Sequence, residues 1–325
     1  MHEAMDEETA EAECIAAMEL VIGAKAPRDP ARAAAMFGKA AAAGHAVGHF
    51  GLAELLMAGD GIARDEELAL MHYREAAADG HPGAMYRLAT LMLEDGPSQD
   101  IPGASALFLR CAEAGMAAAY AVAGDIRFQG LTGEADAEAA YRWYRLAAEA
   151  GDPSAMFSCG YMSEAGIGTA VDEAEALRMF ERSAAAGLAE AQFKMAALAR
   201  EGKAPGGSRE ALRWYRVCSD RGYPAATISL ATMLLEGDGT DRDPETAFSL
   251  YSKVAAETGD ADAHFMVGRM LLEGIGTEAD PEAGLRAMAK AAAAGNEAAR
   301  QLVEGLGKRG GRQPIVIDGT GPAGP

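Results

Sequence analysis

A glycine recurs along almost the whole chain at intervals of 35 to 37 residues, each time after an alanine-rich stretch. A period of this size is typical of proteins built from stacked copies of one small supersecondary unit. It constrains the fold more than any other feature of the sequence. The series of glycines, here numbered as position 0 of each repeat, is Gly44, Gly80, Gly115, Gly151, Gly187, Gly222, Gly259 and Gly295.

The residues after each glycine predict a helix, here called helix A. Position +4 is Gly or Ala in every copy, and positions +8 and +11 are mostly apolar. Offsets of four, four and three residues place these positions on one face of an α-helix. Another glycine usually stands at position +15, where it permits the left-handed backbone of a helix C-cap. These glycines are Gly59, Gly130, Gly166, Gly202, Gly237 and Gly274.

A turn and a second helix, helix B, complete each repeat. Turns such as Gly166-Ile167-Gly168 look like phosphate-binding loops, but they lack the third glycine, the preceding strand and the Lys-Ser/Thr pair. We therefore interpret them as structural turns. Helix B carries one large ring followed by small residues, as in Tyr144 with Ala147-Ala148. Pairs such as Asp29-Pro30 mark its start, because Asp is a good N-cap and Pro fits the first helical position.

The sequence thus predicts an all-α protein, a right-handed αα-superhelix (solenoid) of eight helix-pair repeats plus a C-terminal capping helix. Half of the residues are apolar and only 6% are aromatic. Alanine, the best helix former, is the commonest apolar residue and suits closely packed helices. The solenoid is expected to cover residues 1–308, and a Gly/Pro-rich tail at 309–325 is expected to be disordered. The predicted repeats are 8–44, 45–80, 81–115, 116–151, 152–187, 188–222, 223–259 and 260–295, with the cap at 296–308.

The formal net charge of −20 argues against nucleic acid and anionic membranes as partners, because both attract Lys and Arg. The acidity serves solubility or indicates a preference for a basic partner surface. No signal-peptide pattern and no apolar stretch of membrane-spanning length is found, so the sequence predicts a cytoplasmic protein. The cysteines have no zinc-ligand spacing and are expected to be buried free thiols. They are Cys14, Cys111, Cys159 and Cys218.

At these positions the chain resembles the Sel1-like repeat family, an αα-repeat relative of the tetratricopeptide repeats. The resemblance covers about residues 8–305 and implies a scaffold or adaptor that binds another protein. It rests on the helix A and turn residues of the fifth repeat and on two helix B signatures. These are Ala155, Phe157, Cys159-Gly160 and Gly166-Ile167-Gly168, together with Trp143-Tyr144, Ala147-Ala148 and Trp214-Tyr215.

In solenoids of this kind helix A lines the concave surface, so positions +3, +7, +10 and +14 are groove candidates. Position +14 is Glu in four repeats, although the helix dipole disfavours an acid at a helix C-terminus. Two interpretations stay open: pairing with the helix B arginines (Arg142, Arg178, Arg213 and Arg286), or an acidic strip that meets a basic partner segment. The candidates are Glu54, Arg87, Glu94, Asp125, Tyr161, Glu190, Lys194, Glu201, Glu236, Arg269 and Glu273.

Two further patterns have plain structural interpretations. Rings such as Phe50 and Phe193 recur at position +6, where we expect packing between neighbouring repeats rather than a grip on a peptide. His45 and His49 have a spacing that can bind a metal. No acidic third ligand is fixed near them, so no metal site and no cofactor are predicted.

The sequence predicts a scaffold or adaptor that holds a segment of a partner protein in its groove, and not an enzyme. No S-x-x-K, G-x-S-x-G or HExxH motif is present, so no catalytic residue is predicted. One alternative is a non-catalytic subunit or regulatory part of a larger enzyme assembly, with the tail as linker. Another is a hydrolase like the cysteine-rich, β-lactamase-like relatives, whose paired cysteines this chain lacks. The oligomeric state is left open.

Overall fold

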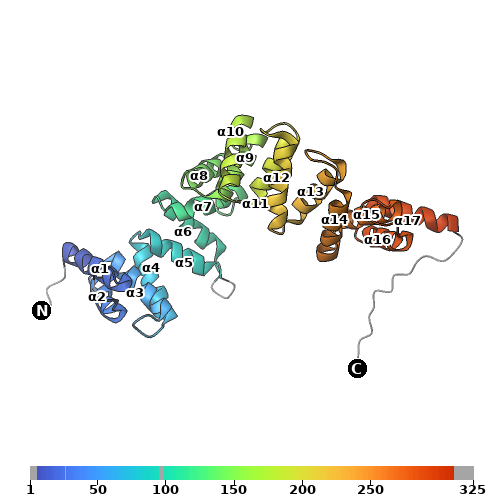
Figure 1. Ribbon diagram of the computed structural model, residues 1–325. Helices are drawn as coiled ribbons and strands as arrows, with labels where there is room; N and C mark the ends of the chain where they lie inside the picture. Colours follow the sequence, from blue (N-terminus) through green and yellow to red (C-terminus); the bar gives the residue numbers. More distant parts are fainter. Residues whose placement is uncertain (1–5, 26, 95–98, 311–325) are drawn as a thin grey trace, which may run out of the picture. The chain divides into compact units, whose positions relative to one another are not determined.

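The computed structural model describes residues 6–25, 27–94 and 99–310. Within these ranges the chain forms seventeen α-helices, one short 3-10 helix and no strand (Figure 1). It divides into two compact units, residues 1–179 and 180–325, and the boundary falls inside helix α10 (Glu173–Ala185). The predicted all-α class and its helix-pair repeats are confirmed.

Odd-numbered helices are the predicted A helices and even-numbered helices are the B helices. For example, α3 and α4 are the A and B helices of the repeat predicted at residues 45–80. Unit 1 contains α1 (Glu7–Ile22), α2 (Pro30–Ala42), α3 (Ala46–Ala58), α4 (Glu66–Ala78), α5 (Pro82–Met92), α6 (Ile101–Glu113), η1 (Ala117–Ala119), α7 (Tyr120–Gln129), α8 (Ala137–Glu149) and α9 (Pro153–Ala165). Unit 2 contains α11 (Ala189–Arg200), α12 (Gly207–Asp220), α13 (Pro224–Glu236), α14 (Pro244–Thr258), α15 (Ala261–Glu273), α16 (Pro281–Ala293) and α17 (Glu297–Gly310).

The predicted start signals of helix B are confirmed. At α2 the Asp29 carboxylate accepts a hydrogen bond from the Arg32 backbone N at 3.0 Å, with Pro30 at the first helical position. Asp280 and Pro281 do the same at α16. The fourth A helix lacks such a cap. Met116 makes no side-chain bond there, and the helix begins with the 3-10 turn η1, which tightens the chain where free N–H groups would otherwise stand.

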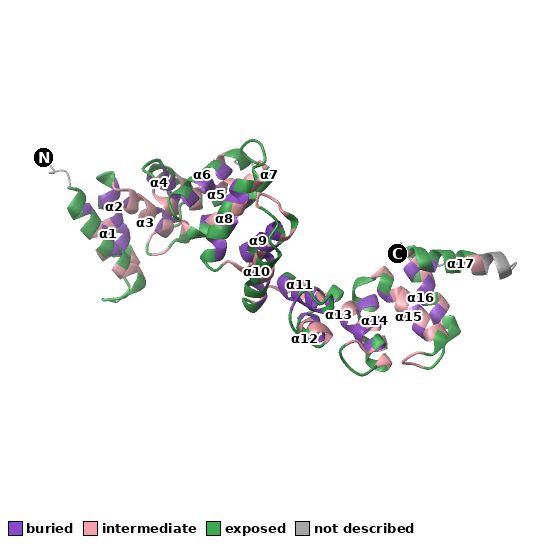
Figure 2. Cartoon of the chain, turned by 90° about the horizontal axis from the view of Figure 1, so that it is seen from above, coloured by how far each residue is buried: buried purple, intermediate pink, exposed green. Residues whose placement is uncertain are grey.

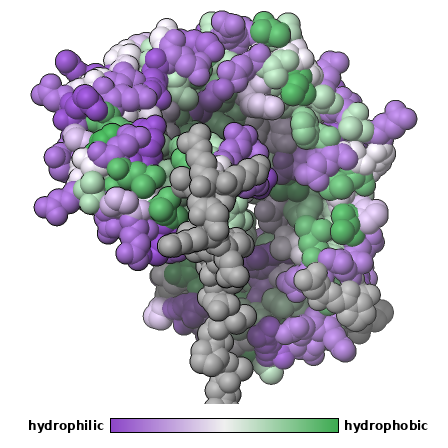
Figure 3. All heavy atoms as spheres, turned by 90° about the vertical axis from the view of Figure 1, so that its right-hand side faces the viewer, coloured by the Kyte–Doolittle hydropathy of each residue, from purple (hydrophilic) through white to green (hydrophobic). Residues whose placement is uncertain are grey.

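Small side chains form the contacts between helices, as the repeat pattern predicts. Position +4 is buried after all eight of the recurring glycines, and Ala155, for example, is 1% exposed. Figure 2 shows the buried residues on the helix faces that meet neighbouring helices and the exposed residues on the outer faces. On the face seen in Figure 3 the side chains are mostly hydrophilic, with hydrophobic ones in separate patches. All four cysteines are free and buried, as predicted.

The G-x-G turns have the structural role that the sequence suggests. Gly166 ends α9 in the left-handed conformation, with φ of 69°, and its N–H bonds back to the Met162 carbonyl. The second glycine has a further role that the sequence does not reveal. A Cβ built on Gly168 would lie 2.1 Å from the Ala137 carbonyl oxygen, at the start of α8 in the preceding repeat. The backbones of successive repeats therefore touch at this glycine.

The rings at position +6 pack as predicted between neighbouring repeats. Phe50 stacks on His81, the first residue after the next position-0 glycine, with ring centroids 4.5 Å apart. Phe193 meets Tyr223 of the next repeat edge-on at 5.5 Å and Tyr215 at 5.4 Å. These rings are part of the scaffold.

The capping helix is present and is longer than predicted, since α17 runs to Gly310. The predicted tail was expected to start at residue 309, and its residues 311–325 lie outside the described residues. In the part of the chain that the structure describes, no helix combines the length and the hydrophobicity needed to span a bilayer.

Candidate partner-binding groove

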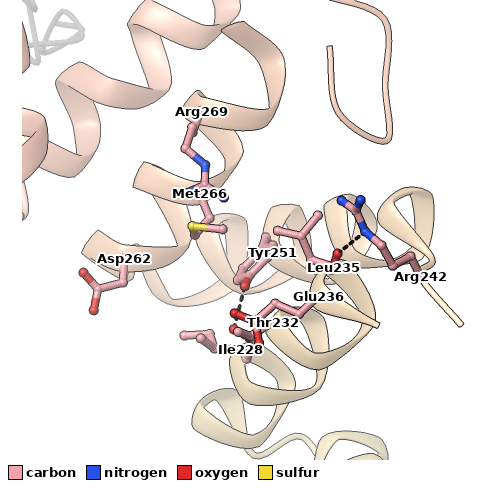
Figure 4. A pocket seen from close by; sticks show the side chains of 9 residues that line it. All are labelled: Ile228, Thr232, Leu235, Glu236, Arg242, Tyr251, Asp262, Met266 and Arg269. Atoms are coloured by element: carbon pink, nitrogen blue, oxygen red, sulfur yellow. Dashed lines mark hydrogen bonds between the residues drawn. The ribbon is translucent and has the colours of Figure 1, made fainter. Parts of the chain in front are cut away.

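Two hollows occur at the same place in the repeat, one in each unit. The α13–α15 hollow, of about 580 Å³, lies between those two A helices and reaches Tyr251 of α14 (Figure 4). The α3–α5 hollow, of about 250 Å³, reaches Tyr73 of α4. Both are bounded by positions +10, +13 and +14 of one A helix and +7 and +10 of the next. Predicted groove rows therefore do border open hollows.

The floor of each hollow is a helix B tyrosine that bonds to the preceding A helix. The Tyr73 hydroxyl donates to the Glu54 carboxylate at 2.6 Å. The Tyr251 and Thr232 hydroxyls lie 2.7 Å apart. Burial, and then the bond to Glu54, raise the pKa of Tyr73, so its hydroxyl keeps its proton and remains a donor. The floor is thereby fixed to the wall of its own repeat.

In the α3–α5 hollow two predicted groove residues neutralise each other. Arg87 donates from Nη2 to Glu54 Oε2 at 2.9 Å, and its Nε lies 2.9 Å from Glu54 Oε1. The paired Glu54 carboxylate raises the pKa of Arg87. Glu94 lies at the same hollow. A two-bond arginine–carboxylate contact of this kind is strong and directional, so the charges of Glu54 and Arg87 are satisfied within the chain.

The α13–α15 hollow differs in its charges. Thr232 stands where Glu54 stands in the other hollow, and it carries no charge to offer. Arg269 lines the hollow, and its Nε atom is buried without a hydrogen-bond partner. Apolar atoms of Ile228, Leu235 and Met266 complete the lining (Figure 4). This hollow is therefore open, partly apolar and lined by two arginines, of which Arg242 donates from Nε to the Leu235 carbonyl at 2.9 Å.

The acidic residues near Arg269 are held elsewhere. Glu236 accepts from Arg200 at 2.8 Å, and Asp262 accepts from the Asn296 side chain at 2.7 Å. In Figure 4 the Asp262 carboxylate points away from Arg269. Two predicted groove residues, Glu236 and Arg269, thus line one hollow without forming a pair.

The other candidates lie outside these two hollows. Asp125 accepts from the Tyr144 hydroxyl at 2.6 Å and so belongs to the scaffold. Tyr161 is 53% exposed. The Lys194 ammonium lies over the Phe180 ring, 5.3 Å from its centroid. Exposed side chains at Glu190, Glu201 and Glu273 complete the set.

Of the two interpretations left open for the +14 glutamates, pairing with the helix B arginines is not found among the described residues. Three of these arginines bind a glutamate three or four residues away on their own helix, where partners are adjacent at little entropic cost. The glutamates Glu201 and Glu236 have other partners. The pairs are Arg178–Glu175, Arg213–Glu210, Arg286–Glu282, Glu201–Lys203 and Glu236–Arg200. The alternative, an acidic strip, is weakened because two of its four members are neutralised.

The floor tyrosines and their acceptors were not predicted, although the sequence carries a signal for them. Where the helix B ring carries a hydroxyl, the residue 19 positions earlier is polar in three of four repeats, and Tyr215 with Ala196 is the exception. Where the ring is Phe, that residue is apolar in two of three repeats, and Phe180 with Tyr161 is the exception. The pairs are Tyr73–Glu54, Tyr144–Asp125 and Tyr251–Thr232, against Phe37–Met18 and Phe108–Ala89.

The two histidines considered as metal ligands have different neighbours. His49 Nδ1 lies 2.8 Å from His72 Nδ1, and His45 Nδ1 lies 3.7 Å from Cys14 Sγ. Among the described residues no three His, Cys, Asp or Glu side chains are grouped so as to hold a metal ion. Burial, followed by the proximity of His49, lowers the pKa of His72.

A larger cavity, of about 910 Å³, lies in unit 1 beside the B helices α4 and α6. Its lining combines apolar side chains such as Leu70 and Leu107 with Arg74 and Arg110. Apart from Glu94, the groove rows do not predict it.

Tandem A and B helices, small residues at the helix contacts and glycine turns between repeats define an αα-repeat protein. The chain belongs to the Sel1 repeat family, which confirms the resemblance seen in the sequence. The family model matches residues 10–45, 46–81, 82–116, 117–152, 153–188, 189–223, 224–258 and 261–296. Sel1 repeats generally mediate protein–protein interactions, and the scaffold is typically non-catalytic.

Solved structures show the same fold. One is a protective antigen present in uropathogenic Escherichia coli strains, with a TM-score of 0.74 and 25% identity over 95% of this chain and 74% of that chain. Another is a Sel1 repeat protein from Oxalobacter formigenes, with a TM-score of 0.63 and 24% identity over 93% of this chain and 88% of that chain. No curated protein matches the chain significantly.

Proposed function

We propose that the chain is a protein-binding scaffold or adaptor that holds a segment of a partner protein along its A helices. The observation that carries the proposal is a contrast between positions within the repeats. Position +4 is small and buried after each of the eight recurring glycines. Positions +7 and +10, which border the hollows, change from Gly51 and Glu54 to Met266 and Arg269. A constant scaffold with a variable face suits the recognition of one particular chain.

The overall charge favours a partner with a basic surface. The net charge of −20 would speed its approach, and added salt would slow it. Since Glu201 and Glu236 are paired, Glu94 and Glu273 are the +14 residues to which a basic segment would bind. We place the protein in the cytoplasm, because a reducing compartment suits four buried free thiols.

Site-specific photo-crosslinking tests the proposal. A photoreactive amino acid at Thr90 and another at Met266 report on the α3–α5 and the α13–α15 hollows. Matched controls carry it at Arg142 and Arg216, which are exposed on the B helices α8 and α12. We expect one and the same protein to crosslink from both hollows and from neither control. Crosslinks that form only at the controls would show that the partner binds the B helices instead.

A further inference from the structure

The α13–α15 hollow contains a guanidinium that the described part of the chain leaves without a counter-charge. Arg269 Nε is one of two buried side-chain polar atoms without a hydrogen-bond partner among the described residues. A buried donor without a partner is costly, and more so when it is charged. An arginine in this state is suited to a partner that arrives from outside the chain.

The other hollow shows what such an arginine binds when an acid is supplied from within. Arg87 is satisfied by Glu54, at position +10 of the preceding A helix. In the α13–α15 hollow that position is Thr232, whose hydroxyl already bonds to Tyr251 and to the Ile228 carbonyl. Position +10 of the first A helix therefore supplies a carboxylate to the arginine of one hollow and only a hydroxyl to the other hollow.

The surroundings of Arg269 favour a carboxylate attached to an apolar neighbour. Met266 and Ile228 are partly buried at the wall of the hollow. Its volume of about 580 Å³ lies within the usual range of binding pockets, about 300–1,000 Å³. Apolar walls exclude water and strengthen an ionic hydrogen bond.

We propose that Arg269 binds an Asp or Glu side chain of the partner segment, with an adjacent apolar residue of that segment against Met266 and Ile228. This inference rests on the proposed function and specifies which side chains of the partner the α13–α15 hollow recognises. The planar guanidinium offers two parallel donors to a carboxylate. A partner that is basic overall is steered by the net charge of the chain. Its acidic residue then fixes the register at Arg269.

A displayed library of random dodecapeptides, selected on the full chain, provides the probe. We expect the selected peptides to carry Asp or Glu at one fixed position beside an apolar residue. Arg269→Met should weaken their binding about 10- to 100-fold, as expected for loss of a charge-assisted hydrogen bond. Arg269→Lys, which keeps the charge, should retain part of the affinity. Arg216→Met, at an exposed arginine of α12, is the matched control and should change nothing.

A double-mutant cycle with Asp→Asn or Glu→Gln in the peptide completes the test. The peptide change should weaken binding to the wild type and have little further effect on Arg269→Met. Peptides that crosslink from Met266 but share no acidic residue, or that bind Arg269→Met at full strength, overturn the carboxylate assignment and leave the proposed function intact. Peptides that crosslink only from Arg216 contradict the proposed function itself.

Discussion

Replacing Gly276 by Ala should destabilise unit 2 far more than replacing Gly274, two residues earlier in the same turn. The two glycines have nearly equal φ angles, 68° and 69°. A left-handed backbone costs a non-glycine residue about 1–2 kcal/mol. This part of the cost is therefore common to both variants, and Gly274→Ala serves as the control.

The difference comes from the neighbouring repeat. A Cβ at position 276 would lie 2.1 Å from the Pro244 carbonyl oxygen, at the start of α14, whereas the nearest atom to a Cβ at 274 is the Ala279 Cβ, at 3.4 Å. A carbon–oxygen contact normally needs about 3.3 Å. The two repeats must therefore separate by about 1 Å, and such overpacking costs about 1–3 kcal/mol. We expect losses of about 1–2 kcal/mol for Gly274→Ala and about 2–5 kcal/mol for Gly276→Ala.

Urea denaturation followed by circular dichroism measures the two free energies of unfolding. Hydrogen exchange at the first turn of α14 should also speed up in Gly276→Ala and stay slow in Gly274→Ala. Equal losses in the two variants would refute the argument, because only position 276 touches the preceding repeat.

Three further predictions follow from contacts in unit 1. Ala155→Leu should overpack a buried helix contact and lower the free energy of unfolding by about 1–3 kcal/mol; an unchanged melting temperature would contradict its burial. Tyr144→Phe should cost about 1–2 kcal/mol, because Asp125 loses its donor, while Tyr161→Phe, at an exposed ring, should cost nothing in the same denaturation assay. The pKa of His72 is lower in the folded chain than in the unfolded chain, so the unfolded chain binds a proton at this residue more readily. The contribution of neutral His72 to the free energy of unfolding is therefore complete above pH 6.5 and is lost as the pH falls. His72→Gln should flatten that dependence in melts taken from pH 7.5 to 5, and an unchanged slope would show that the His49–His72 contact does not titrate.

Most of the fold follows from the sequence because local rules agree with the repeat. Asp residues cap the starts of most B helices, with Pro next at α2, α14 and α16, and the spacing of small residues sets the buried face. The fourth A helix departs from this pattern locally, since the 3-10 turn η1 replaces its first helical residues.

The candidate site was less predictable, because periodicity gives the helix face on which a residue lies and not the side chain to which it bonds. It correctly put Glu54, Arg87, Glu236 and Arg269 on the A-helix face. Whether each charge is satisfied depends on side chains 19 to 36 residues away, such as Tyr73 and Arg200. The assumption that the +14 glutamates pair with helix B failed because acids on helix B itself were closer.

The bond between each floor tyrosine and its acceptor joins residues of one helix pair, whereas the opposite wall of the hollow comes from the next repeat. Gene duplication or recombination with breakpoints in the turns would therefore keep each tyrosine together with its acceptor. It would place a different A helix at the opposite side of the hollow. Hollows of new chemistry could arise in this way without any change to a buried contact. The α3–α5 and α13–α15 hollows, one closed by an internal acid and one open, are two products that such shuffling would yield.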